Sequence, residues 1–75
     1  DFEKAIEYFQ IVTASNPDMP EAWNNLGVAF YGLGRIDEAL ESYDRSIALD
    51  PSNLDALRNR AFLLRNQKRL IVLHF

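Results

Sequence analysis

The chain repeats itself at a step of 34 residues, and this repetition constrains its fold more than any other feature. The first half recurs in the second with the same or a similar residue at Ala5/Ala39, Glu7/Glu41, Phe9/Tyr43, Ala14/Ala48 and Pro17/Pro51. The register continues through Ala22/Ala56, Asn25/Asn59, Gly27/Ala61 and Phe30/Leu64. So many matches at one spacing indicate a repeat unit that buries its apolar face by stacking on its neighbours.

Each unit has the pattern of two amphipathic helices. Trp23, Leu26, Gly27 and Phe30 fall at i, i+3, i+4 and i+7, and a second face of the same kind follows at Ile36, Ala39, Leu40 and Tyr43. Between them lies the stretch 32–34, where a glycine beyond a helix end can close the turn in the left-handed conformation. The first residues show the second face again, at Phe2, Ala5, Ile6, Phe9 and Val12. The sequence therefore predicts helical hairpins, with residue 1 already inside a second helix.

Prolines and polar residues mark the ends of these helices. Pro17 and Pro51 each stop a second helix, because proline lacks a backbone donor and biases its predecessor away from helical geometry. Asp18 and Asn53 are predicted to cap the helices that follow, and Asp37 the helix after the glycines. Pro20 is tolerated in a first turn.

Composition limits what this chain can be. With 75 residues, 48% of them apolar and 25% charged, it forms one compact unit. It has no cysteine, which excludes disulfides and thiolate metal sites and leans weakly towards the cytosol. The start has no signal-peptide pattern, and the apolar run Leu70–Leu73 is too short to span a membrane. We expect a soluble piece of a longer protein.

Charge is distributed unevenly. All 11 acidic residues lie within residues 1–55, whereas five of the eight basic residues follow them, at Arg58, Arg60, Arg65, Lys68 and Arg69. The net charge of −3 and the neighbouring acidic segment disfavour binding of nucleic acid by the whole piece.

These residues resemble the tetratricopeptide repeat. The signature positions are occupied by Trp23, Leu26, Gly27, Phe30, Gly34, Ala39, Tyr43 and Pro51, and only Ser46 departs, where alanine is usual. The resemblance implies an all-α fold, an α-α superhelix of helix-turn-helix repeats. It divides the chain into a second helix of a partial repeat at 1–19, a complete repeat at 20–53 and a partial or capping repeat at 54–75.

The resemblance also implies a protein-binding function, on the concave surface lined by first helices. The matching residues here are Asn24, Asn25, Val28, Tyr31, Arg58, Asn59, Phe62 and Arg65. Asn25 and Asn59 fall at the same place in consecutive repeats, and their amides can bond an extended peptide backbone or a neighbouring helix. The carboxylate clamp of some family members fits poorly, since Asp55 and Asn59 stand where lysine and arginine are expected, with Arg58 and Arg65 as possible substitutes.

The third repeat leaves alternatives open. Arg60 takes the position of Leu26 and Lys68 that of Gly34, as suits a wetted terminal repeat. The last residues lack the start of a regular second helix, so they form a cap, a divergent helix or a truncated end. Leu70, Ile71, Val72, Leu73 and Phe75 are apolar and offer a surface for self-association, which makes a structural spacer the rival function.

Nothing in the sequence assembles an enzyme site. His74 is the single histidine, no nucleophile has a recognisable base, and the acidic run Asp37, Glu38, Glu41 and Asp44 is typical of a solvated helix face. Gly27, Gly32 and Gly34 follow no strand and precede no lysine-serine pair, so they form no phosphate loop. We expect neither cofactor nor metal. An enzyme elsewhere in the parent chain, served by this piece as a recruitment module, stays open.

Overall fold

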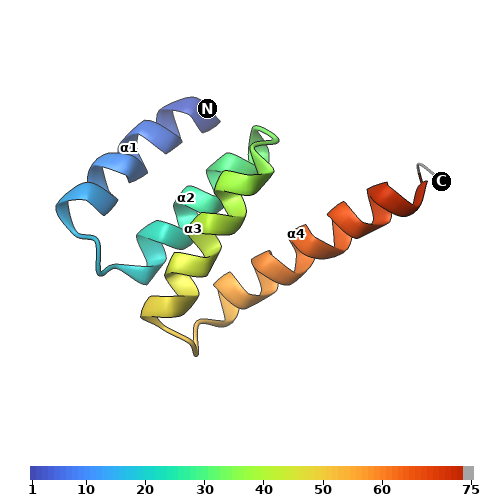
Figure 1. Cartoon of the computed structure of the whole chain (residues 1–75). Helices are drawn as coiled ribbons and strands as arrows, with labels where there is room; N and C mark the ends of the chain where they lie inside the picture. Colours follow the sequence, from blue (N-terminus) through green and yellow to red (C-terminus); the bar gives the residue numbers. More distant parts are fainter. Residues whose placement is uncertain (74–75) are drawn as a thin grey trace.

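The computed structural model describes the backbone of residues 1–73 and the side chains of residues 1–67. That part of the chain forms four helices and no strands: α1 (Phe2–Ser15), α2 (Pro20–Gly32), α3 (Ile36–Leu49) and α4 (Leu54–Leu73). Successive helices run in nearly opposite directions and are joined by short turns (Figure 1). The predicted all-α architecture of stacked helical hairpins is confirmed.

The predicted helix boundaries are confirmed at some residues and wrong at others. In this chain α1 begins at Phe2, and the Asp1 side chain accepts the N–H groups of Glu3 and Lys4. Pro20 is the first residue of α2, and the Asn53 side chain accepts the N–H groups of Asp55 and Ala56 as the cap of α4. Asp18 caps nothing.

Two of these helices lack a side-chain cap altogether. Met19 and Arg35 occupy the cap positions of α2 and α3, and neither makes a side-chain capping bond. Asp37 lies one position inside α3, where a carboxylate interacts with the helix dipole instead of capping it. The prediction failed because Asp18 lies one residue before the cap position of α2 and Asp37 lies two residues after that of α3.

The turn between α2 and α3 depends on Gly34. Its φ of 78° lies in the left-handed region, which costs an L-residue with a Cβ about 1–2 kcal/mol. The N–H of Gly34 donates to the Tyr31 carbonyl and that of Arg35 to the Phe30 carbonyl, at 2.9 Å each. These bonds satisfy carbonyls left open at the end of α2 and reverse the chain within three residues.

The helices approach most closely at Gly27. A Cβ built there would lie 2.5 Å from Tyr43 Cε1, so only glycine allows the ring of Tyr43 to lie against the α2 backbone. Tyr43 is 3% exposed and Ala39, one turn earlier on α3, is fully buried. The predicted role of these small residues is confirmed. The core of which they are part comprises Ile6, Leu26, Ala29, Phe30, Ala39, Tyr43 and Leu63.

Ser46, the departure from the family pattern, is fully buried and joins two turns. Its hydroxyl donates to the Pro20 carbonyl at 2.7 Å and accepts from the Asn53 amide nitrogen at 3.4 Å. An alanine there lacks the hydroxyl and could form neither bond. The hydroxyl therefore fixes the start of α2 relative to the start of α4.

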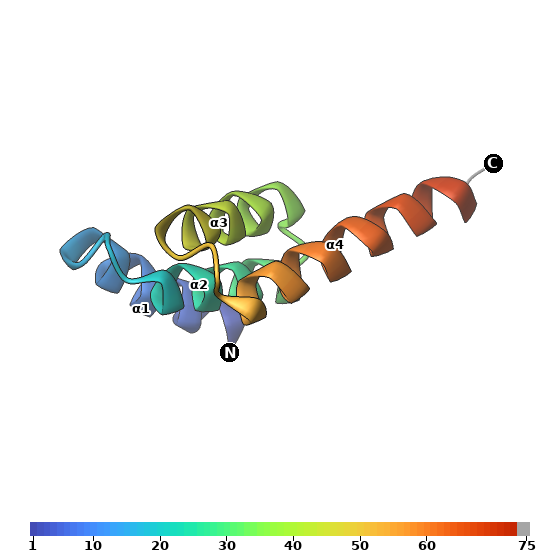
Figure 2. The same ribbon diagram turned by 90° about the horizontal axis from the view of Figure 1, so that it is seen from below.

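The last helix, α4, is longer than its equivalent α2 and does not end at the position where α2 turns into α3. α4 runs through the positions equivalent to 32–34 without a break, and its C-terminal half extends away from the other helices (Figures 1 and 2). Arg60 forms a 2.7 Å ion pair with Asp44 of α3. The apolar residues predicted to mediate self-association, Leu70, Ile71, Val72, Leu73 and Phe75, lie outside the described side chains, as does His74.

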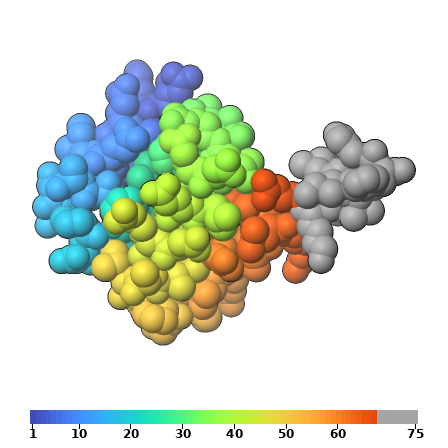
Figure 3. All heavy atoms as spheres, in the orientation of Figure 1, coloured from blue at the N-terminus to red at the C-terminus, as the bar shows by residue number. Residues whose placement is uncertain are grey.

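Viewed as spheres, α1, α3 and the start of α4 form a continuous surface, with α2 largely covered between α1 and α3 (Figure 3). The other side of α2 lies next to the start of α4 and is accessible. Figure 2 shows this arrangement as two layers, with α3 in one layer and α2 and α4 in the other.

Candidate functional site

The eight residues predicted to face a partner lie on two neighbouring helices. Asn24, Asn25, Val28 and Tyr31 belong to α2, and Arg58, Asn59, Phe62 and Arg65 to α4. All eight are at least partly exposed, and the apolar side chains of Val28 and Phe62 are 43% and 54% exposed. Exposed apolar side chains on adjacent helices form a surface suited to contact with another molecule.

Hydrogen bonds hold the two helices side by side at this surface. The amide nitrogen of Asn59 donates to the side-chain oxygen of Asn24 at 3.0 Å, and that of Asn66 donates to the Tyr31 hydroxyl at 2.9 Å. The rings of Tyr31 and Phe62 meet at a centroid distance of 6.1 Å. The structure thus brings together residues 35 apart in sequence.

Asparagine has two different roles in this arrangement. Asn59 uses an amide hydrogen for Asn24, which is the helix-bonding alternative for this position. The Asn25 side chain is exposed and has no hydrogen-bond partner among residues 1–67. A ligand-binding role for either residue stays a prediction, and Asn25 is the one whose amide is accessible at no cost to the fold.

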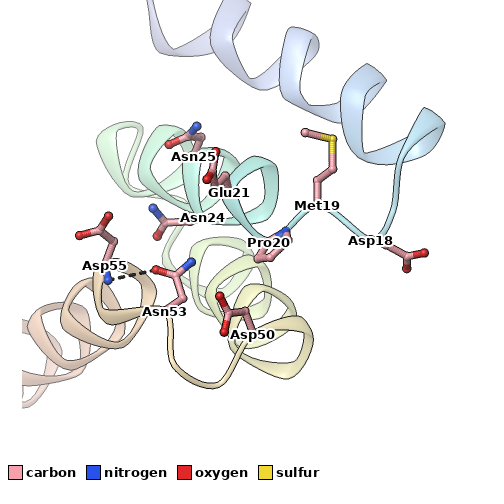
Figure 4. A pocket seen from close by; sticks show the side chains of 9 residues that line it. All are labelled: Asp18, Met19, Pro20, Glu21, Asn24, Asn25, Asp50, Asn53 and Asp55. Atoms are coloured by element: carbon pink, nitrogen blue, oxygen red, sulfur yellow. Dashed lines mark hydrogen bonds between the residues drawn. The ribbon is translucent and has the colours of Figure 1, made fainter.

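A pocket of about 580 Å³ opens beside these residues, at the N-terminal ends of α2 and α4 (Figure 4). Of the predicted set it includes Asn24 and Asn25; the other lining residues are Asp18, Met19, Pro20, Glu21, Asp50, Asn53 and Asp55. None of these seven belongs to the binding surface predicted from the sequence, although Asp55 stands at a clamp position, because the sequence pattern did not place the two turns next to each other. The sequence did contain one signal for this pocket. The helix register places the turn before α2 and the turn before α4 at the same end of the stack.

A second, apolar pocket of about 300 Å³ lies between α1 and α2. Phe2, Ala5 and Phe9 form one wall, and Asn25, Val28 and Ala29 form the other. Asn25 and Val28 therefore border both this pocket and the exposed surface shared with α4. The accessible surface thus changes from polar at the helix N-termini to apolar further along α2.

Arg58 and Arg65 are exposed on α4, and neither lines a pocket found in the described part of the chain. No ion pair joins either guanidinium to a carboxylate within residues 1–67, where the ion pairs are Arg35–Glu38 and Arg60–Asp44. Their predicted role as substitutes in a carboxylate clamp stays a prediction.

Perturbed pKa values do not mark a reaction centre. The hydrogen bond from Arg35 lowers the pKa of the Glu38 carboxyl, and burial raises the pKa of the Tyr43 hydroxyl. The first shift follows from the turn that holds Arg35 and Glu38, and the second follows from the position of Tyr43 in the core. Among the described residues, no three side chains of histidine, cysteine, aspartate or glutamate are grouped closely enough to hold a metal ion. Nor does that part of the chain contain a helix with the length and hydropathy of a membrane span.

Comparison with known proteins connects this surface to a family. A family model described as tetratricopeptide repeat matches residues 1–53 and again residues 29–70. The two matches overlap over residues 29–53, which include the end of α2, the turn and the whole of α3, as expected for units that repeat in register.

Two of the relatives are much longer proteins than this chain, and a third is of similar length. The peroxisomal targeting signal receptor of Eremothecium gossypii is 38% identical over 61 residues, which cover 81% of this chain and 11% of the receptor. Superkiller protein 3 of Saccharomyces cerevisiae is 35% identical over 60 residues, 80% of this chain and 4% of that protein. An uncharacterised protein of Methanocaldococcus jannaschii is 42% identical over 50 residues, 67% of this chain and 58% of that protein.

The chain therefore spans about a tenth of the length of the receptor it matches. Its 34-residue register, its helix hairpin with Gly27 against Tyr43, and the family match over residues 1–70 agree with one another. The chain belongs to the tetratricopeptide repeat family.

Proposed function

We propose that the surface shared by α2 and α4 binds a segment of a partner protein in an extended conformation. Tetratricopeptide repeats act as protein-interaction modules, and the receptor relative is named for a targeting signal. The observation that carries the proposal is the 580 Å³ pocket beside an exposed apolar surface, both on the side of α2 that α1 and α3 leave accessible.

Asn25 is assigned the main polar contact. Its exposed amide offers one donor group and one acceptor, which match the C=O and N–H of a peptide backbone without demanding a particular side chain. Val28 and Phe62 supply apolar contact next to it. Asn59 contributes indirectly, since its bond to Asn24 holds α4 against α2.

The test is selection from a displayed library of random ten-residue peptides with the full 75-residue chain, followed by fluorescence anisotropy. Asn25→Ala is expected to weaken a selected peptide by about three- to tenfold, the value of one hydrogen bond. Asn16→Ala, an exposed asparagine at the end of α1, is the matched control and should change nothing. Failure to select any peptide, or equal affinity for all three proteins, contradicts the proposal.

A structural role in a longer array is the second candidate, and one observation favours it. Leu57 and Leu64 on α4 are 38% and 37% exposed, although their equivalents in the complete hairpin, Trp23 and Phe30, pack against the core. A further helix placed against α4 would bury them. Sedimentation of the same samples at several concentrations separates the two functions. A monomer that binds peptide supports the peptide-binding function. Self-association that blocks peptide binding supports the structural role.

A further inference from the structure

The pocket at the helix N-termini is lined by acidic side chains and by no basic one. Asp18, Glu21, Asp50 and Asp55 contribute carboxylates, and the remaining lining residues are uncharged. In Figure 4, Asp18 and Asp55 lie at opposite sides of the pocket, with Glu21 and Asp50 between them. These four residues come from three separate segments, the turn before α2, the start of α2 and the region around the start of α4.

The chain does not neutralise this charge in its described part. Arg35 pairs with Glu38, Arg60 pairs with Asp44, and the Arg45 guanidinium lies 5.0 Å from the centre of the Trp23 ring. None of these three arginines lines the pocket. Arg58 follows Asp55 by one helical turn and forms no ion pair with it.

Stabilisation of the helix ends explains the position of some of these carboxylates, but it does not offset the total negative charge of the four. Glu21 and Asp55 lie in first turns, and Asp50 accepts the N–H and hydroxyl of Ser52. A helix N-terminus is equivalent to roughly half a positive charge, so two of them offset only about one of the four negative charges. The pocket lining therefore keeps a net negative charge.

The spacing of the carboxylates selects the kind of cation. No three acidic side chains in the described residues come close enough to hold a metal ion. A spread of separate carboxylates around an open pocket instead suits a long cationic side chain, which can enter and donate to one of them.

Apolar contact lies a short distance along the same surface. Phe62 is two helical turns beyond Asp55, about 10 Å along α4 at 1.5 Å per residue. An extended peptide rises about 3.3 Å per residue, so roughly three residues of a partner bridge that distance. Val28 and the Phe62 ring are the exposed apolar groups at that end.

We infer that the partner is a basic-apolar segment, with a lysine or arginine in the acidic pocket and an apolar side chain about three residues away against Val28 and Phe62. The inference rests on the proposed function and specifies its ligand. Charge complementarity between the segment and the pocket adds on-rate and selects against acidic segments.

The peptides selected from the random library give the first test. Enrichment of lysine or arginine about three residues from an apolar residue supports the inference. Selected peptides without that enrichment overturn it and leave the proposed function standing, whereas selection of no peptide contradicts both.

Affinity measurements with a selected peptide give the second test. The double variant Glu21→Gln/Asp55→Asn is expected to bind about tenfold more weakly at low salt, with a smaller difference at high salt. The matched control, Asp37→Asn/Glu41→Gln, removes the same charge from α3 outside the pocket and should change affinity less than about twofold. Equal loss in both variants would show a general charge effect and overturn the assignment to the pocket. Circular dichroism of each variant verifies that the helices are intact.

Discussion

Gly27→Ala should destabilise the chain even though alanine is the better helix former. In the middle of a helix the change from glycine to alanine is worth about 1 kcal/mol of stability. Against this gain, the new Cβ would lie 2.5 and 2.6 Å from two ring carbons of Tyr43, about 1 Å inside ordinary contact distance. The ring cannot retreat into solvent, since Tyr43 is only 3% exposed. Such overpacking costs about 1–3 kcal/mol, so the net effect is a loss of about 0–2 kcal/mol.

A double-mutant cycle isolates the two contributions. In a Tyr43→Leu background the ring is gone, and Gly27→Ala should then stabilise by the full propensity gain of about 1 kcal/mol. The assay is urea unfolding followed by far-ultraviolet circular dichroism. An osmolyte such as TMAO keeps the Tyr43→Leu chain folded, because its exclusion from protein surface favours burial.

The coupling between the two sites decides the outcome. We expect a coupling free energy of about 1–3 kcal/mol, equal to the cost of the overlap. If Gly27→Ala stabilises the chain by the same amount with Tyr43 and with leucine at that position, the reasoning is refuted. The close approach of α2 and α3 would then not depend on glycine.

Two further predictions concern the turn and the core. Gly34→Ala places a Cβ in open space but at a φ of 78°, so it should cost about 1–2 kcal/mol in the same unfolding assay, with Gly34→Asn losing less; equal stability of the three proteins would contradict it. Burial raises the pKa of Tyr43 above its ordinary value near 10, so its contribution to stability is complete below that pH and is lost as the pH rises through the folded pKa. Unfolding titrations between about pH 9 and 12 should show this loss diminished in Tyr43→Phe, and an unchanged profile would show that other groups cause it.

The repeat register predicted most of the fold because the same local rules act in each unit. Apolar faces at helical spacing and prolines at helix ends depend on neighbours close in sequence, and the contact of Gly27 with Tyr43 lies within one repeat. Cap assignments were less successful, since capping depends on the backbone of a single turn. Asn53 caps α4, but Asp18 and Asp37 do not cap α2 and α3.

Contacts between distant residues could not be predicted from local pattern. Arg60 was expected to meet solvent at a wetted end, and its pairing with Asp44 depends on how α4 packs against α3. Asn59 could equally have bonded a ligand or a helix, and only the position of Asn24 shows which bond it makes in the free chain. The eight residues predicted to form the surface lie on two adjacent helices, as expected, but the prediction left out the turn residues that line the acidic pocket.

Ser46 connects the departure from the family pattern to that pocket. Its hydroxyl bonds the Pro20 carbonyl and the Asn53 amide, and both of these residues line the pocket. An alanine, the usual residue of the family, would remove the link between the two turns. The hydroxyl thus sets the separation of Glu21 and Asp55, which follow Pro20 and Asn53 by one and two residues. If the proposed basic segment binds here, a buried residue of α3 therefore contributes to its recognition through the position of these carboxylates.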